Sequence, residues 1–129
     1  MVKLNAIHHV AIICANYQTS KEFYTKILGF TVLAEHYRNE RKSYKLDLAL
    51  GDHYCVELFS FPEPPRRLSR PEACGLRHLA FEVDDLMTTI SWLHQNSVVT
   101  EPIRVDEFTG KRFTFCEDPD NLPLEFYER

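Results

Sequence analysis

The sequence predicts an α+β protein built from two consecutive β-α-β-β-β repeats. Three observations support this prediction. An apolar run that contains a histidine begins each half of the chain, and a stretch with helical spacing of apolar residues follows each run. A proline-rich segment, residues 61–73, separates the halves. We therefore expect one domain over residues 1–129, with a first unit at 1–60, a connector at 61–73 and a second unit at 74–129.

The first repeat is expected to begin with a buried strand at residues 5–14, "NAIHHVAIIC", because Ile, Val and Ala dominate this stretch. A helix follows, since Thr19 or Ser20 can cap its start and Gly29 suits the left-handed position that ends many helices. The apolar face of this helix is formed by Phe23, Ile27 and Leu28. Three strands come next, with a tight "GD" turn between the last two. They cover residues 30–37, 43–51 and 53–61.

The second repeat follows a segment that holds four of the seven prolines and can continue neither a central strand nor a helix. The run at residues 75–83, "GLRHLAFEV", repeats the apolar character of the first strand. Asp84 or Asp85 can cap the next helix, and Asn96 lies near its end. The inward face of that helix carries Leu86, Ile90 and Leu93. Strands at 98–105, 111–118 and 122–128 complete the repeat, with a "DPDN" turn before the last one.

The composition narrows the class of function. The formal charge of −4 argues against a general nucleic-acid binder, which needs an excess of Lys and Arg. No apolar run reaches the ~20 residues of a membrane helix, and no secretory signal is recognisable, so we expect a cytoplasmic protein with no membrane partner. The four cysteines are far apart in sequence and indicate neither a zinc ribbon nor a disulfide scaffold.

Aligning the two repeats pairs residues that can carry chemistry. "IHHVAI" lies over "LRHLAF", which pairs His9 with His78. "VELFSF" lies over "LEFYER", which pairs Glu57 with Glu125, and the separations within each repeat are nearly the same, 48 and 47 residues. Each unit thus has one histidine at its first strand and one glutamate on its last strand. Strand alternation then predicts that His8 points to the face opposite His9.

Two imidazoles and two carboxylates suit a divalent metal such as Zn, Ni, Co, Mn or Fe(II) better than they suit calcium or a structural zinc site. Glu57 and Glu125 lie among apolar neighbours, where an ionised carboxylate is costly without a cation. The alternative is that His9 and His78 are hydrogen-bonded strand histidines and that both glutamates face water. The pattern favours a shared metal site.

These residues resemble a known family. "HHVAI", "SKEFYTKILGF", "RHLAFEVDD" and "FCEDPDNLPLEFYE" are similar to sequences of the vicinal oxygen chelate superfamily, and in particular to small bacterial glyoxalase I-like proteins. "FSFPEPP" and "SRPEACGLRHLAF" are similar to the YaeR-type subgroup. The resemblance implies the glyoxalase/bleomycin resistance/dihydroxybiphenyl dioxygenase fold, in which the two units form a U-shaped mixed sheet around a metal cleft. It also implies a homodimer.

By this resemblance the metal ligands are His9, Glu57, His78 and Glu125, holding one divalent ion per site, with nickel or zinc favoured over cobalt, manganese or iron. The expected activity is that of a lyase or isomerase of lactoylglutathione lyase type. It acts on a small α-hydroxycarbonyl compound or hemithioacetal through a metal-chelated enediolate. Glu125 is the expected base and Glu57 its counterpart.

Two departures from the glyoxalase I pattern argue against glutathione as part of the substrate, because the expected anchoring positions hold Ile13 and Phe61. A set of basic residues could instead recognise an acidic substrate, or could be solvated surface charges. The set comprises Arg66, Arg67, Arg70, Arg77, Arg104, Lys111 and Arg112. Two other functions remain open: an Fe(II) dioxygenase that needs two histidines and one carboxylate, and a small-molecule binding protein without turnover.

Overall fold

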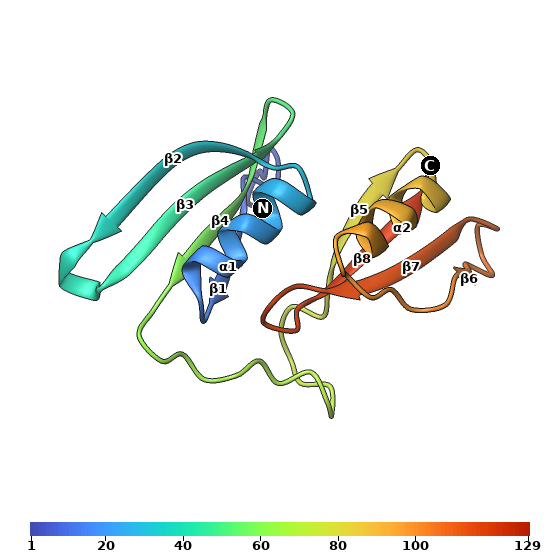
Figure 1. Cartoon of the computed structure of the whole chain (residues 1–129). Coiled ribbons are helices and arrows are strands. Elements are labelled where there is room, and N and C mark those ends of the chain that lie inside the picture. Colours follow the sequence, from blue (N-terminus) through green and yellow to red (C-terminus); the bar gives the residue numbers. More distant parts are fainter. The chain divides into compact units, whose positions relative to one another are not determined.

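The computed structural model describes all residues, 1–129, and contains two compact units, Met1–Pro65 and Arg66–Arg129. Each unit has one four-stranded sheet and one main helix (Figure 1). The order of elements along the chain repeats from one unit to the other, strand, helix, three strands. The α+β class and the two β-α-β-β-β repeats predicted from the sequence are confirmed.

The sheet of the first unit has the strand order β1-β4-β3-β2. Its first and last strands are parallel neighbours, and the remaining pairs are antiparallel. The helix α1 continues directly into a π-helical turn, Phe23–Ile27. The bounds are β1 Val10–Cys14, α1 Tyr17–Glu22, β2 Thr31–Arg38, a 3₁₀ turn at Asn39–Arg41, β3 Ser43–Leu50 and β4 His53–Ser60.

The sheet of the second unit has the corresponding order β5-β8-β7-β6. Here too the first and last strands are parallel neighbours. The strand β6 has only two residues, much shorter than the 98–105 segment that the sequence predicts. The bounds are β5 Leu79–Val83, α2 Leu86–Gln95, β6 Arg104–Val105, β7 Arg112–Glu117 and β8 Pro123–Glu128.

Each sheet has one buried face and one more open face. On β4, Val56 and Leu58 are buried, whereas the alternate residue Glu57 is only partly covered. On β8, Leu124 and Phe126 are buried in the same way on either side of Glu125. The helices α1 and α2 contact β4 and β8 respectively, so the buried residues form the core between helix and sheet (Figure 1). Each glutamate therefore lies on the sheet face opposite the helix of its own unit.

The cap predicted from the sequence is wrong for α1 and correct for α2. Asn16, rather than Thr19 or Ser20, caps α1, because its side-chain oxygen accepts a hydrogen bond from the Thr19 amide at 3.0 Å. Asp85 caps α2 through the Thr88 amide at 2.9 Å, as one of the two predicted options.

The interior faces of the helices also follow the sequence in part. Leu86, Ile90 and Leu93 of α2 are buried as predicted. In the first unit Phe23 is buried, but Tyr24 is fully buried as well, because the π-helical turn widens the helix at this point. Gly29 follows the turn with φ of 81°, the left-handed conformation predicted for it. Neither helix is long and apolar enough to cross a membrane.

Candidate functional site

His9 and Glu57 form a pair on the open face of the first sheet. Ala11 pairs with Glu57 across β1 and β4, and His9 lies just before β1, two residues ahead of Ala11. The Nε2 atom of His9 lies 3.4 Å from Oε2 of Glu57. The Glu57 side chain is 12% exposed, and that of His9 is 34% exposed. The pair is thus sheltered at the carboxylate and open at the imidazole.

Tyr54 joins this pair because of an irregularity in β4. The register between β3 and β4 shifts between Leu48 and Ala49, so Ala49 pairs with Tyr54 and the strand has one extra residue. The shift places Tyr54 on the same face as Glu57. Its hydroxyl donates a hydrogen bond to Glu57 and lies 3.2 Å from Oδ1 of Asp47. Burial, together with the charges of both carboxylates, raises the pKa of Tyr54 well above its ordinary value.

Two further groups complete the surroundings of Glu57. The Lys45 ammonium lies 2.7 Å from Asp47 Oδ1 and 3.8 Å from Glu57 Oε2. The ring of Tyr54 stacks on the ring of His9, with centroids 5.5 Å apart and planes 5° from parallel. Glu57 therefore has three neighbours that bear on its carboxylate: an imidazole, a phenol and an ammonium group.

The prediction for His8 is wrong. Its Nδ1 lies 2.8 Å from Nδ1 of His9, and its ring meets the Tyr54 ring edge-on, with centroids 5.3 Å apart. The reason is that β1 begins at Val10, so strand alternation does not apply to residues 8 and 9. The contact engages Nδ1 of His9, while its Nε2 lies toward Glu57.

His78 and Glu125 form the matching pair in the second unit. Ala80 pairs with Glu125 across β5 and β8, and His78 precedes Ala80 by two residues. The Nε2 atom of His78 lies 3.0 Å from Oε2 of Glu125, whose side chain is 14% exposed. Phe115 pairs with Glu125 from β7, and its ring meets the His78 ring edge-on, with centroids 5.2 Å apart. This pair thus has an aromatic neighbour where the first pair has Asp47 and Lys45.

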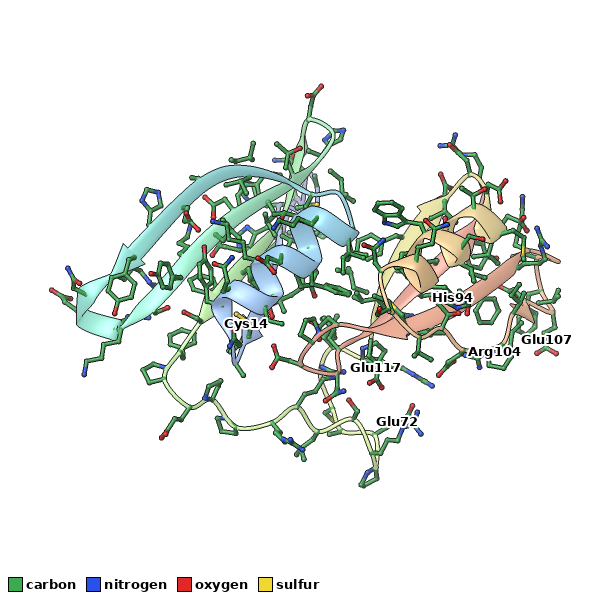
Figure 2. The ribbon with its side chains drawn as sticks, in the orientation of Figure 1. Cys14, Glu72, His94, Arg104, Glu107 and Glu117 are labelled. Atoms are coloured by element: carbon green, nitrogen blue, oxygen red, sulfur yellow. The ribbon has the colours of Figure 1, made fainter.

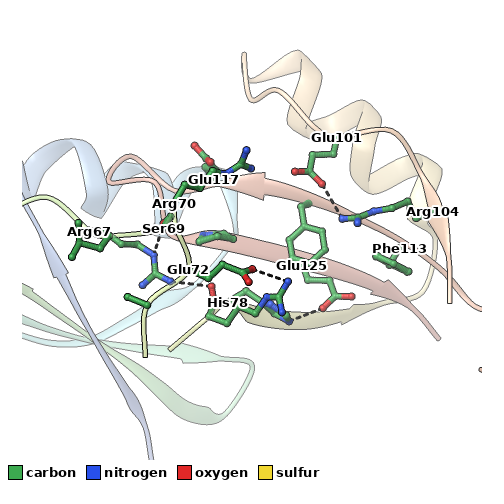
Figure 3. A pocket seen from close by; sticks show the side chains of 15 residues that line it. Arg67, Ser69, Arg70, Glu72, His78, Glu101, Arg104, Phe113, Glu117 and Glu125 are labelled. Carbon is green, nitrogen blue, oxygen red and sulfur yellow. Dashed lines mark hydrogen bonds and ion pairs between the residues drawn. The ribbon is translucent and has the colours of Figure 1, made fainter. Parts of the chain in front are cut away.

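A cavity of about 460 Å³ opens beside His78 and Glu125, entirely within the second unit. In Figure 3, Arg104 and Phe113 lie at one end of the cavity, Arg70 and Glu117 at the other, and His78 and Glu125 between them. Its volume lies within the range of small-molecule sites. The lining combines arginines, glutamates and phenylalanines, so it offers both polar and apolar contacts.

The donor atoms in each unit fit a divalent cation. Two ligand atoms that bind one ion at about 2.1 Å and at a right angle lie ~3 Å apart, and the two Nε2 to Oε2 separations are 3.4 Å and 3.0 Å. The structure contains no group of three or more His, Cys, Asp or Glu side chains arranged to hold a metal ion. His9 and Glu57 lie in the first unit, and His78 and Glu125 lie in the second.

Comparison with known protein families identifies a match over nearly the whole chain. Residues 6–126 match the profile of the Glyoxalase/Bleomycin resistance protein/Dioxygenase superfamily. The chain belongs to this superfamily. It is 60% identical to YwkD of Bacillus subtilis over 98% of both chains, and 58% identical to YaeR of Escherichia coli over 100% of both. The family resemblance predicted from the sequence motifs is confirmed.

Solved structures of superfamily members share the fold. A glyoxalase family protein from Enterococcus faecalis is 52% identical, with a TM-score of 0.89 over 95% of this chain and 97% of that one. The trypanothione-dependent glyoxalase I of Leishmania major is 23% identical, with a TM-score of 0.75, and shows the fold alone.

Among related sequences, a 2-epi-5-epi-valiolone epimerase from an Actinomyces species is 27% identical over 93% of this chain. The superfamily thus includes enzymes.

Within this superfamily fold, the sequence did not point to Tyr54, because its place beside Glu57 depends on the irregular pairing of β3 with β4. The structure also separates the basic residues that the sequence left equivalent. Arg67 donates hydrogen bonds to the carbonyl oxygens of Leu76 and Arg77, and Arg77 pairs with Glu72 at 2.9 Å. These two arginines hold the chain around the cavity.

Arg112 has a different role again. Its guanidinium lies 2.6 Å from the Glu128 carboxylate, so this ion pair joins β7 to β8. Neither residue lines the cavity. Arg66 and Lys111 do not line the cavity either. Four arginines line the cavity. Arg67 binds backbone carbonyl oxygens and Arg77 pairs with Glu72, whereas Arg70 and Arg104 contact neither of these groups.

Proposed function

We propose that the chain is a metal-dependent, glyoxalase I-like lyase or isomerase that acts on a small α-hydroxycarbonyl compound or hemithioacetal. The observation that carries the proposal is the matched pair in each unit: an imidazole Nε2 within 3.0 to 3.4 Å of a glutamate Oε2, on the sheet face opposite the helix of that unit. An enzymatic role agrees with the glyoxalase I and the epimerase among its relatives. The screen described below tests the substrate and any thiol that it requires.

In this proposal His9, Glu57, His78 and Glu125 hold one divalent cation, and nickel or zinc suits the nitrogen and oxygen donors best. When bound, the cation would polarise a carbonyl oxygen and so make the neighbouring C–H more acidic. The two units act as one domain, and a homodimer is the proposed assembly. The ligand pairs then meet either within one chain or between two.

The two glutamates differ in their partners and in their access to the cavity. Glu57 is held by the Tyr54 hydroxyl and lies 3.8 Å from Lys45. Glu125 has His78 as its only ion-pair partner and lies in the cavity beside the Phe115 ring. A base takes a proton from the substrate and later returns it, so its carboxylate must be within reach of the substrate, and Glu125 but not Glu57 lines the cavity. Glu125 is therefore the proposed base, which takes the proton from the substrate carbon and returns it to the neighbouring carbon.

The first test is metal analysis of the purified protein, followed by a screen of methylglyoxal with and without several thiols. Replacement of His9 by Ala should lower the bound metal below half of the wild-type content. The matched control is His53→Ala, which removes an exposed histidine of the same unit from the start of β4. Equal metal content in both variants and wild type would overturn the proposed ligand set.

One observation favours a second candidate, an Fe(II) dioxygenase. Tyr54 and Lys45 already contact the Glu57 carboxylate. The remaining three residues, His9, His78 and Glu125, could therefore form the two-histidine, one-carboxylate set of such enzymes. Oxygen uptake by protein reconstituted anaerobically with iron tests this candidate. Glu57→Gln should retain most of the activity of a dioxygenase but lose that of a lyase.

A further inference from the structure

Arg104 is held above two aromatic rings at one end of the cavity of the second unit. Its guanidinium carbon lies 5.1 Å from the ring centroid of Phe113 and 5.3 Å from that of Phe115. The placement follows from the sheet, since Arg104 of β6 pairs with Phe113 of β7. The rings cover one face of the guanidinium, and its N–H donors lie at the edge of that plane.

Phe115 connects this arginine to the proposed reacting end of the site. The His78 ring centroid lies 5.2 Å from the Phe115 ring centroid, nearly the same distance as the Arg104 guanidinium carbon. A small organic molecule lying against Phe115 can therefore reach both groups. Figure 3 shows Arg104 and Phe113 on one side of Glu125 and His78 on the other.

Several other charged groups that line the cavity have partners of their own. Glu72 pairs with Arg77 at 2.9 Å, and Glu125 with His78 at 3.0 Å. Glu117 accepts a hydrogen bond from the Asn121 amide at 2.8 Å. Arg67 binds backbone carbonyl oxygens, and Arg70 lies at the end of the cavity away from Phe113 (Figure 3). Arg104 is thus the cavity arginine placed over Phe113.

Glu101 is the one carboxylate near Arg104, at 3.0 Å. Both side chains are about half exposed, and an ion pair of this kind contributes little to stability. A guanidinium has five N–H donors, and this pair uses one of its nitrogens. Arg104 thus keeps donors for a carboxylate that enters the cavity.

We propose that the cavity binds a compound with a carboxylate group on a short apolar or planar body. Arg104 binds the carboxylate, Phe115 and Phe113 lie against the body, and the far end reaches His78 and Glu125. That this far end is an α-hydroxycarbonyl group rests on the function proposed above. The binding of the carboxylate by Arg104 stands apart from the metal.

The probe is phenylacetate, with phenylacetamide as its neutral counterpart of nearly the same shape. Each is titrated into ¹⁵N-labelled protein, zinc-loaded and after chelator treatment, and binding is followed by the amide shifts of β7 and β8. The acid should bind at least tenfold more tightly than the amide, and added salt should reduce this difference. Equal binding of acid and amide would overturn the inference.

Variants assign the effect to Arg104. Arg104→Gln should weaken phenylacetate binding at least tenfold and bring it to the level of the amide. Glu101→Gln removes the competing carboxylate and should tighten binding a few-fold. Because this second change acts in the opposite direction, a loss of folding cannot imitate it. Arg66→Gln, which removes the same charge outside the cavity lining, should bind as the wild type does.

The two proposals can fail separately. If Arg104 dependence persists after chelator treatment, the carboxylate site stands whether or not the metal proposal holds. If binding is abolished by the chelator and unchanged in Arg104→Gln, the metal alone binds the probe. That result overturns the inference and leaves the proposed metal site in place.

Discussion

Glu57 and Glu125 are the same residue type at matched positions, yet their surroundings are chemically different. Glu57 faces Asp47 across the strand pair and accepts a hydrogen bond from Tyr54. Glu125 faces Phe115 at the equivalent place. Glu57 thus has a hydroxyl and an ammonium group as neighbours, whereas Glu125 has an aromatic ring at the matching position. Two glutamates that the sequence makes equivalent thus have different proposed roles.

The Tyr54 hydroxyl should contribute to metal binding by fixing the orientation of Glu57. Tyr54→Phe removes the hydrogen bonds to Glu57 and Asp47 while keeping the ring that stacks on His9. We expect metal affinity to fall about 10- to 100-fold, as for other partners of metal-binding carboxylates. Competition with a chromogenic chelator measures the change.

Tyr44→Phe is the matched control for this experiment, because the Tyr44 ring stacks on Tyr17 in the same unit, 4.1 Å between centroids, away from the ligand pair. Its affinity for metal should equal that of the wild type. Unchanged affinity in Tyr54→Phe would show that Glu57 is oriented by its strand alone.

The cysteines should differ sharply in reactivity. Cys74 is exposed, whereas Cys14 at the end of β1 (Figure 2) and Cys116 in β7 are buried. Burial, with the nearby charges of Asp118 and Glu117, raises the pKa of the Cys116 thiol to about 12. At pH 8 an aromatic disulfide reagent should label Cys74 first and Cys116 only after unfolding. Rapid labelling of Cys116 in the native protein, located by peptide mass analysis, would contradict this placement.

At the scale of single elements, the helices α1 and α2 begin with chemically different N-cap residues. Asn16 caps α1 with a neutral amide, and Asp85 caps α2 with a carboxylate. The backbone amide of Thr88, followed by its side chain, holds the pKa of Asp85 below its usual range. Only the second cap therefore depends on pH.

Alanine at each cap should separate these effects. Asn16→Ala should cost about 1 kcal/mol at any pH between 3 and 7. Asp85→Ala should destabilise the protein at pH 7, where the carboxylate is ionised. Because the folded-state pKa is lowered, the charge-dependent part of this cost is present above the unfolded pKa, about 3.9. It should shrink as the pH falls through the folded pKa.

Urea unfolding of the wild type and both variants at several pH values measures these costs. A cost for Asp85→Ala that stays constant down to pH 2 would show that the ionised carboxylate is not what stabilises the start of α2.

The strand β8 joins the core and the site, since buried residues alternate with Glu125 along it. Leu124→Ala should cost about 3 kcal/mol, because this side chain is completely buried beneath the sheet and leaves a cavity when shortened. The expected loss is large enough to loosen His78 and Glu125 as well. Thermal unfolding with and without added zinc measures both the loss and any recovery by the metal.

At the scale of the whole molecule, two similar units each supply one imidazole and one carboxylate. A four-ligand site requires the pairs of two units, within one chain or between two chains of a homodimer. The two arrangements predict different behaviour when variants are mixed. This difference can be measured without a known substrate, by metal content.

Glu57→Gln and Glu125→Gln each damage one pair. If the site forms between chains, in the version that joins His9 and Glu57 of one subunit to His78 and Glu125 of the other, mixed dimers contain one intact site. Mixing the two inactive proteins should then restore up to about a quarter of the wild-type metal content, because half of the dimers are mixed. Restoration of nothing, after subunit exchange has been verified, means that each chain builds its own site.

The sequence alone predicted the repeat, the helix stop at Gly29 and the four candidate ligands, because local signals carry these features. Apolar alternation decides which strand residues share a face, and a glycine in the left-handed conformation has few substitutes. The matching of the two halves then gives the candidates His9, Glu57, His78 and Glu125. They remain a prediction for the metal analysis to test.

Only the tertiary structure decided what surrounds those residues. Tyr54 reaches Glu57 because β3 and β4 pair irregularly, His8 contacts His9 because β1 begins at Val10, and Arg104 lies over Phe113 because β6 pairs with β7. Each of these depends on hydrogen-bond register between strands, which is set by pairing across the sheet and not by neighbouring residues. The sequence therefore determined which groups each strand carries, and strand pairing determined which of them share a face and touch.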